Sequence, residues 1–366
     1  MSGDGAELCG TLRALLLFDV AEEIDLGRLH HLIGSSPSQR EPAFRRPAPE
    51  YVRFEKAPVT EYLPACQDAS GELLGARVRY FEYGVASVEL VKPFQTSWTQ
   101  LIRLANRWIM SPELERRARS LLAGRLETLA DVLKKPYPDW IAEDYYVAQV
   151  DPIQNGTPVS ADDLIRHCGA QIAQIVRGEE LPLSDAECEE VLQSRISYYP
   201  ADLVVAGWVA AFVHDSAAAA APTLDLLEYA NTQLLEFRYY DEVLTRVLAK
   251  VYRQIDARRG FARPWRLARE AAELNTMRLD YRELSERTEN AIKFLSDMYY
   301  ARVYRLAAAR IGVNDYRNLV TEKLNTARDL YDSMVNEFHQ QRAFFLELMV
   351  VIILIIEIVF LFRGKA

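Results

Sequence analysis

The last part of the chain constrains the fold most, because it is a long apolar stretch in a sequence that is otherwise rich in charge. From Ala343 to Phe362 there are 20 residues, of which 17 are Leu, Ile, Val, Phe or Met. As a helix this run is about 30 Å long, which matches the hydrocarbon core of a bilayer. The run therefore predicts a single C-terminal transmembrane helix, followed by a short tail over 363–366.

Two carboxylates interrupt this run, Glu347 and Glu357. Ten residues at about 100° per residue place them roughly 80° apart around a helix, on one side. Acidic groups in such a position indicate an assembly or functional site. The alternatives are a snorkelling Glu347 with a tolerated Glu357, or a helix buried in a water-soluble core.

The start of the chain, MSGDGAELCG, has no basic segment before an apolar one and does not look like a signal or transit peptide. We therefore expect a single-pass protein with its bulk on the cytoplasmic side of a membrane. The formal net charge of −9 argues against a general nucleic-acid-binding surface. The four cysteines show no Cys-x-x-Cys pair and no zinc-like spacing with histidine, so no metal site is predicted.

Residues 1–215 alternate strand and helix patterns and predict an α+β domain. A strand is expected at 11–20, a hairpin around Tyr83-Gly84, and helices over 97–133 with a break at Ser111-Pro112. Further predictions are a strand at 144–152 and helices capped by Ser160 and Ser184. The segments 52–57 and 195–205 also read as strands, and the second resembles the hairpin around Gly84, which suggests two related units sharing a sheet.

Residues 216–342 predict a helical region that includes a long antiparallel hairpin. One helix is expected at 223–255, and two seams with apolar steps of three and four follow over 274–298 and 316–338. Gly312 and Asn314 suit the turn between them. If the first helix of this hairpin were straight and antiparallel to the second, its start would extend into the lipid that surrounds the predicted anchor. We therefore also expect a kink or splay between residues 273 and 286.

An arginine-rich loop precedes this hairpin. Its members are Arg258, Arg259, Arg263, Arg266 and Arg269, interleaved with Phe261 and Trp265. They form a candidate contact patch for lipid headgroups or an RNA backbone, and the alternative is a solvated loop with one buried aromatic anchor.

No motif for chemistry is found: the sequence has no phosphate-binding glycine loop, no G-x-S-x-G and no H-E-x-x-H. We predict no catalytic residue and no cofactor. An enzyme with a pocket in which His167 or His214 meets carboxylates stays open as an alternative, with Asp215 and Cys168 as further candidates. The polar residues of one helix are interpreted as ion pairs at three- and four-residue spacing along that helix, and the alternative is a carboxylate metal site. These residues are Glu228, Asn231, Gln233, Glu236, Arg238 and Asp241.

The residues from Val320 to Phe362 resemble the end of the RMD/YagE family, known as required for meiotic nuclear division. Leu346-Glu347 and the second acid, Glu357, carry this resemblance, and the segment 13–29 is also similar. The resemblance implies a non-enzymatic, membrane-anchored protein. The excess of arginine over lysine, the many alanines and the lack of a transit peptide favour a bacterial inner membrane.

The sequence as a whole predicts a C-terminally anchored, self-associating scaffold or tether. Its domains would be an α+β domain over 1–215, a helical hairpin over 216–342 and the anchor over 343–362. The expected partners are the lipid bilayer, further copies of the chain and an unidentified protein. An RNA- or ribosome-contacting module built on the arginine-rich loop is the third alternative.

Overall fold

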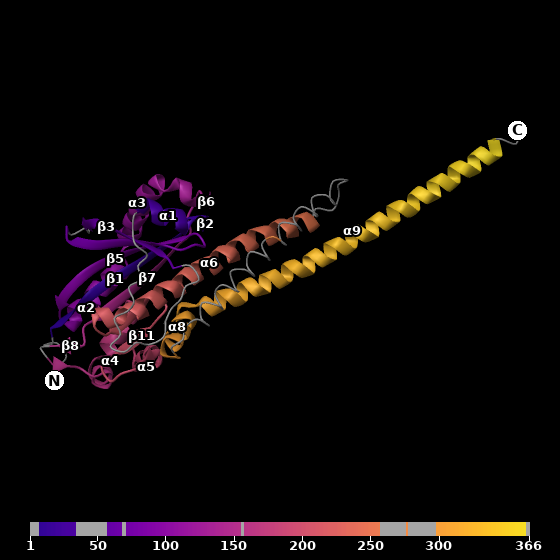
Figure 1. The fold of residues 1–366 in the computed structure, drawn as a ribbon. Helices are drawn as coiled ribbons and strands as arrows, with labels where there is room; N and C mark the ends of the chain where they lie inside the picture. The colour runs from indigo at the N-terminus through magenta and orange to yellow at the C-terminus, as the bar shows by residue number, and fades with distance from the viewer. Residues whose placement is uncertain are drawn as a thin grey trace. The chain divides into compact units, whose positions relative to one another are not determined.

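The computed structural model describes residues 7–33, 57–67, 71–154, 157–256, 276 and 298–363 (Figure 1). The chain divides into two compact units. Unit 1 comprises Met1–Tyr239 and Glu286–Tyr316, and unit 2 comprises Tyr240–Ser285 and Arg317–Ala366.

Unit 1 is built on one large sheet of eight strands in the order β10-β11-β12-β7-β1-β5-β4-β3. Neighbouring strands are antiparallel, except that β12 runs parallel to β7. The strands are β1 (Leu8–Asp19), β3 (Val59–Gln67), β4 (Leu73–Tyr80), β5 (Val85–Thr96), β7 (Ala142–Val150), β10 (Arg195–Ile196), β11 (Leu203–Ala206) and β12 (Ala210–His214). Two small sheets pair β2 (Ala21–Ile24) with β6 (Leu133–Pro136) and β8 (Ile153–Gln154) with β9 (Thr157–Pro158). The fold is mixed α+β.

Helices cover the first face of this sheet. They are α2 (Trp98–Ile109), α3 (Pro112–Thr128) and α4 (Ala161–Arg177), which contact β7, β1 and β12 respectively. Shorter elements flank them: α1 (Leu26–Ile33), the 3-10 turn η2 (Ala130–Val132) and α5 (Asp185–Gln193). The predicted caps are confirmed, because the Ser160 hydroxyl accepts from the Asp163 amide and the Ser184 hydroxyl from the Glu187 amide.

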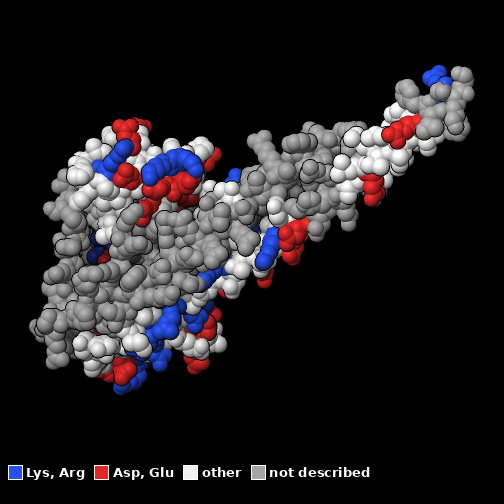
Figure 2. All heavy atoms as spheres, turned by 45° about the vertical axis from the view of Figure 1, so that its right-hand side comes forward, with Lys and Arg blue, Asp and Glu red and all other residues white. Residues whose placement is uncertain are grey.

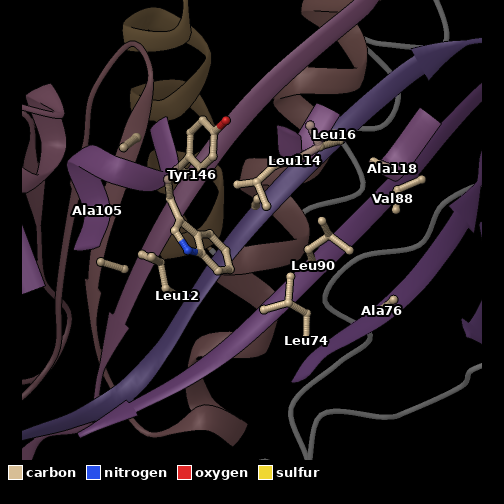
Figure 3. Close-up of a cluster of buried hydrophobic side chains, with 14 of the residues drawn as sticks. Leu12, Leu16, Leu74, Ala76, Val88, Leu90, Ala105, Leu114, Ala118 and Tyr146 are labelled. Atoms are coloured by element: carbon tan, nitrogen blue, oxygen red, sulfur yellow. The ribbon is translucent and has the colours of Figure 1, made fainter. Parts of the chain in front are cut away.

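The main hydrophobic core lies between this face and its helices (Figure 3). Even-numbered residues of β1, such as Leu12 and Leu16, point into it beside Val88 and Leu90 of β5. Successive strand residues point to opposite faces, so the odd-numbered residues of β1 point to the second face of the sheet. That second face carries the charged groups described below.

The hairpin predicted around Tyr83-Gly84 is confirmed as the connection between β4 and β5. Gly84 has φ +93°, and a Cβ built there would lie 1.7 Å from the carbonyl oxygen of Ala21. Both the backbone conformation and the close approach require glycine. The second predicted strand pair also exists, since β10 pairs with β11 in the same sheet. The relationship of the two units by an internal repeat stays a prediction.

The long helix α6 (Ala217–Asp256) begins in unit 1 and continues into unit 2. Side chains of its first half bind to residues on the second face of the sheet, as detailed below. The shorter helix α8 (Met298–Ile311) also belongs to unit 1, where it contacts β11.

A turn at Gly312 (φ +93°) joins α8 to α9 (Val313–Arg363), which confirms the predicted turn. The prediction of Asn314 as the N-cap is wrong, because α9 already begins at Val313. Within unit 2, Lys323 of α9 donates to an Asp241 carboxylate oxygen at 2.5 Å and to the Thr245 hydroxyl at 2.6 Å on α6. Val320 and Ala327, two members of the predicted second seam, are buried. The first seam and the predicted kink between 273 and 286 fall almost wholly outside the described residues, as does most of the segment 52–57.

The predicted membrane anchor over 343–362 needs correction. Its residues form the end of one continuous 51-residue helix, α9. Among the described residues, no helix combines the length and the apolar character that crossing a membrane requires. Charged residues occupy much of α9, and Glu347 and Glu357 interrupt the apolar stretch itself. This finding overturns the predicted transmembrane helix, the bilayer as its surroundings, and the single-pass membrane localisation.

Candidate functional site

The first half of α6 is unusual because it is buried on nearly all sides and still contains many polar side chains. Residues 222–237 are buried, except for the partly exposed Asp225. The buried polar residues among them are Thr223, Glu228, Asn231, Thr232, Gln233 and Glu236. A helix that is buried all round is normally apolar, and buried polar groups need partners. The partners therefore identify what this helix does.

A network of ion pairs, which we call the charged layer, connects α6 to the second face of the sheet. It consists of Arg13, Arg77, Arg79, Glu89, Asp225 and Glu228. Arg79 of β4 contacts Glu228 at 2.6 Å and Asp225 at 2.7 Å. On the sheet itself, Glu89 of β5 pairs with Arg77 and, at 2.7 Å, with Arg13.

The strand register explains why these groups meet. Arg77 lies directly opposite Glu89 in the β4·β5 pair, and Arg79 lies two residues further on the same face. Burial by itself would raise the pKa of Glu228, but the charges of Arg79 and Arg77 outweigh it and hold this pKa below its usual value. Three arginines thus face three carboxylates, and the charged layer is neutral overall.

A second group, the carboxyl pair, lies where β1 ends. Asp19 and Glu236 are 2% and 5% exposed, and one oxygen of Glu236 (Oε1) has no hydrogen-bond partner among the described residues. Burial raises the pKa of Asp19 to about 8. Burial and the neighbouring charge of Asp19 raise the pKa of Glu236 well above its usual value. Both groups therefore carry protons in the folded protein near neutral pH.

Aromatic and hydroxyl groups surround the carboxyl pair. Tyr137 and Tyr239 stack with their ring centroids 5.1 Å apart, and the Tyr83 hydroxyl lies 2.7 Å from that of Thr232. Raised carboxyl pKa values also occur in general acids. Here the two carboxyls are almost completely covered, so the arrangement suits attachment of α6 to the sheet better than contact with a substrate.

The interpretation of the polar α6 residues as ion pairs along the helix is wrong. Glu228 pairs with the sheet arginines, Arg238 with Glu143 of β7, and Asp241 with Lys323 of α9. The reason is tertiary: the second face of the sheet supplies the counter-charges that helical spacing alone cannot reveal.

The candidate histidines lie in different surroundings, and the charges of Asp202 and Asp151 act on His214. His167 is exposed on α4. His214 is fully buried at the end of β12 and its Nε2 lies 3.2 Å from the carbonyl oxygen of Val159. Burial lowers the pKa of His214, so this ring is neutral at physiological pH. Among the described residues, no three His, Cys, Asp or Glu side chains are arranged to hold a metal ion.

The predicted assembly residues Glu347 and Glu357 are both exposed on α9. Thirteen large apolar side chains between Phe344 and Val359 are exposed with them, each by 44–68%. In Figure 2 the described far end of the chain is largely uncharged, with acidic groups interrupting it. The five predicted contact arginines, Arg258, Arg259, Arg263, Arg266 and Arg269, lie outside the described residues.

Five residues of these two groups were not predicted from the sequence: Asp19, Arg13, Arg77, Arg79 and Glu89. One signal could have revealed the last three. Arg77 and Arg79 alternate with apolar residues in β4, while Glu89 interrupts the apolar run of β5, so one face of a central sheet is charged. A charged face in the middle of a sheet predicts an oppositely charged element packed on it.

One curated relative shares this region of the chain. The uncharacterized protein MJ0711 from Methanocaldococcus jannaschii, an archaeon, is 21% identical over 198 residues, which is 54% of this chain. The matched region spans 61% of that relative's own length. No solved structure matches the chain. The RMD/YagE family is not shown by these matches.

A family match covers residues 9–220 of 366, which includes the eight-stranded sheet and its first-face helices. On this match, the chain belongs to the family described as uncharacterized protein MJ0711, N-terminal domain.

Proposed function

We propose that this protein is a non-enzymatic assembly factor that associates with copies of itself through the end of α9. One observation carries the proposal: thirteen large apolar side chains, from Phe344 to Val359, are exposed on this part of one helix. Exposed apolar patches of this kind mark interaction surfaces. The sheet unit would then be displayed several times in one assembly and would engage a further protein.

The energetics support several copies rather than two. Full burial of a Leu, Ile or Phe side chain is worth roughly 1.5–3 kcal/mol, so covering a half-exposed one contributes about 1 kcal/mol. Association costs roughly 4–15 kcal/mol in lost freedom of motion. The exposed side chains occupy almost every position from 344 to 359, so they surround the helix. A single partner helix covers the apolar side chains on one side of α9 only, whereas a bundle of several helices covers apolar side chains on more than one side.

The positions of the two glutamates indicate which side of each helix faces the other copies. At about 100° per residue, Glu347 and Glu357 lie roughly 80° apart, and Ile352 and Val359 lie on the opposite side of the helix. Val350 and Leu354 lie between the two acids on the same geometry. Charged carboxylates are best left in water, so the side with Ile352 and Val359 should face the other copies.

Other parts of the chain support a non-enzymatic role. The ionisable groups of the charged layer neutralise one another, and the carboxyl pair is covered. The resemblance of the C-terminal residues to the RMD/YagE family, through Leu346-Glu347 and Glu357, also favours a protein without catalytic residues.

Sedimentation velocity of the full chain at micromolar concentration tests the proposal. The wild type should sediment as an oligomer, and the Ile352→Lys, Val359→Lys variant should shift to monomer. The matched Val350→Lys, Leu354→Lys variant adds the same charge to the same helix and should remain oligomeric. A monomeric wild type, or equal loss of assembly in both variants, would contradict the proposal.

A further inference from the structure

We propose that a surface formed by Tyr198, Tyr199 and Tyr299, with Asp202 and Asp215 beside it, binds arginine side chains of a partner peptide. We call this surface the tyrosine patch. It lies in unit 1, where the β10–β11 turn meets the start of α8. The inference is independent of assembly through α9, because a different surface carries it.

The turn that displays the tyrosines is held rigidly. Both oxygens of the Asp202 carboxylate accept backbone N–H groups, from Tyr198 at 2.7 Å and from Tyr199 at 3.0 Å. The amide of Ala161, at the start of α4, donates to the carbonyl oxygen of Pro200 at 2.7 Å. Interaction surfaces are commonly built on loops fixed by a rigid scaffold, because less conformational freedom is lost on binding.

The rings are packed against one another and yet leave aromatic surface open. Tyr198 meets Tyr199 edge-on at 4.7 Å between centroids and Tyr299 at 5.1 Å. Tyr299 is buried, whereas Tyr198 and Tyr199 are 56% and 66% exposed. Tyrosines anchor many interfaces because they supply a large contact area with few rotatable bonds. An exposed pair fixed in this way is suited to receive a flat side chain.

The charges beside the rings favour a cation. Burial, together with the charges of Asp202 and Asp215, raises the pKa of Tyr299, so these two acids act on the patch. No salt bridge within the described part of the chain neutralises either acid. The negative charges of the two acids and the negative faces of the rings both attract a cation.

The chain itself shows which cation fits. The guanidinium carbon of Arg302 lies 6.0 Å from the centroid of the Tyr299 ring. Arginine stacks on aromatic faces better than lysine, since its guanidinium is planar and more weakly hydrated. The exposed rings of Tyr198 and Tyr199 offer a partner the type of contact that Arg302 makes within the chain.

Fluorescence anisotropy with a fluorescein-labelled hexaarginine peptide tests this inference, at about 0.15 M salt, where surface charges are screened beyond roughly 8 Å. The full chain should bind hexaarginine more tightly than a labelled hexalysine of equal charge. The Tyr198→Leu, Tyr199→Leu variant keeps apolar area and net charge but loses both rings, and it should bind hexaarginine roughly tenfold more weakly.

Tyr62→Leu is the matched control, because Tyr62 is also 66% exposed but lies on β3 at the opposite edge of the sheet. Its affinity for hexaarginine should equal that of the wild type. Three results would each overturn the inference: no measurable binding by the wild type, equal binding of the two peptides, or an unchanged affinity in the double variant whose circular dichroism and melting match the wild type. None of them affects assembly through α9, which sedimentation measures separately.

Discussion

At the scale of single residues, the fold depends on buried ionisable groups that are kept in one charge state. In the charged layer, the carboxylates of Glu89, Asp225 and Glu228 face the charges of three arginines. The carboxyl pair remains protonated because it is buried and has no cation beside it among its described contacts. The two groups attach the same stretch of α6 to the same face of the sheet, with opposite dependence on pH.

The carboxyl pair predicts that stability falls as the pH rises from about 4 to about 8. The pKa of Asp19 is raised from 3.8 to about 8 in the folded protein. Its stabilising protonation is complete below the unfolded pKa and is lost as pH rises towards the folded one, so stability falls across this window. The variant Asp19→Asn removes the dependence. Its free energy of unfolding should gain about 2 kcal/mol or more relative to wild type between pH 5 and pH 8.

Urea denaturation at several pH values measures this difference. Glu179→Gln changes the same charge at an exposed position and serves as control, with the pH dependence of the wild type expected. If the free energy of unfolding changed with pH in the same way for Asp19→Asn and the wild type, the carboxyl pair would not be protonated.

The charged layer predicts a large cost for removing one partner. Arg79→Met leaves the buried carboxylate of Glu228 without its nearest counter-charge, which typically costs about 3–5 kcal/mol. The double variant Arg79→Met, Glu228→Met should recover a large share of that loss, because no buried charge is left unpaired. Lys134→Met, which breaks an exposed pair with Glu23, should change the free energy of unfolding far less than Arg79→Met does. Urea denaturation of the three variants distinguishes a buried network from surface pairing.

At the scale of elements, caps and turns fix where helices and strands begin and end. Ser160 and Ser184 start α4 and α5, while glycines with positive φ make the turns at Gly84 and Gly312. These are local features, and the sequence predicts them correctly because each depends on a few neighbouring residues. The partners of α6 are not local: Arg79 and Glu228 are 149 residues apart in the chain.

Two glycine substitutions should change stability in opposite directions. Gly84→Ala meets both a left-handed backbone and the Ala21 carbonyl, so we expect a loss of about 2 kcal/mol or more. Gly124→Ala lies in α3 with open space around its Cβ, and should gain roughly 0.5–1 kcal/mol. Thermal unfolding of both variants measures the shifts. A melting temperature for Gly84→Ala equal to that of the wild type would show that the β4–β5 turn can relax.

At the scale of the whole molecule, a single chain exposes an apolar surface to water. The exposed apolar side chains from Phe344 to Val359 belong to this surface, and so do Glu347 and Glu357. Association of several copies would cover the apolar side chains and leave the two acids at the rim.

The double variant Glu347→Gln, Glu357→Gln tests that placement. Acids at the rim contribute little to assembly, so the oligomer measured by sedimentation should keep its size and midpoint concentration within about threefold. Dissociation of this variant into monomers would instead place the two carboxylates inside the contact between copies.

Local sequence features were enough to predict the α+β class, the hairpin at Gly84, the capped helices and the helical turn at Gly312. Each of these follows from periodicity or from turn and cap residues, which act over a few positions. The apolar run near the C-terminus was also visible, but its interpretation as a membrane span was overturned by the finding on the described helices.

The residues that meet across the sheet could be identified from the three-dimensional fold alone. It brought β4, β5 and α6 together to form the charged layer, and it placed α8 beside β11 to complete the tyrosine patch. The physical reason is that the effect of a buried charge or an exposed ring depends on the groups that lie next to it in space. For Arg79, Glu236 and Tyr198 those neighbours lie far away in the sequence, or on another element of the fold.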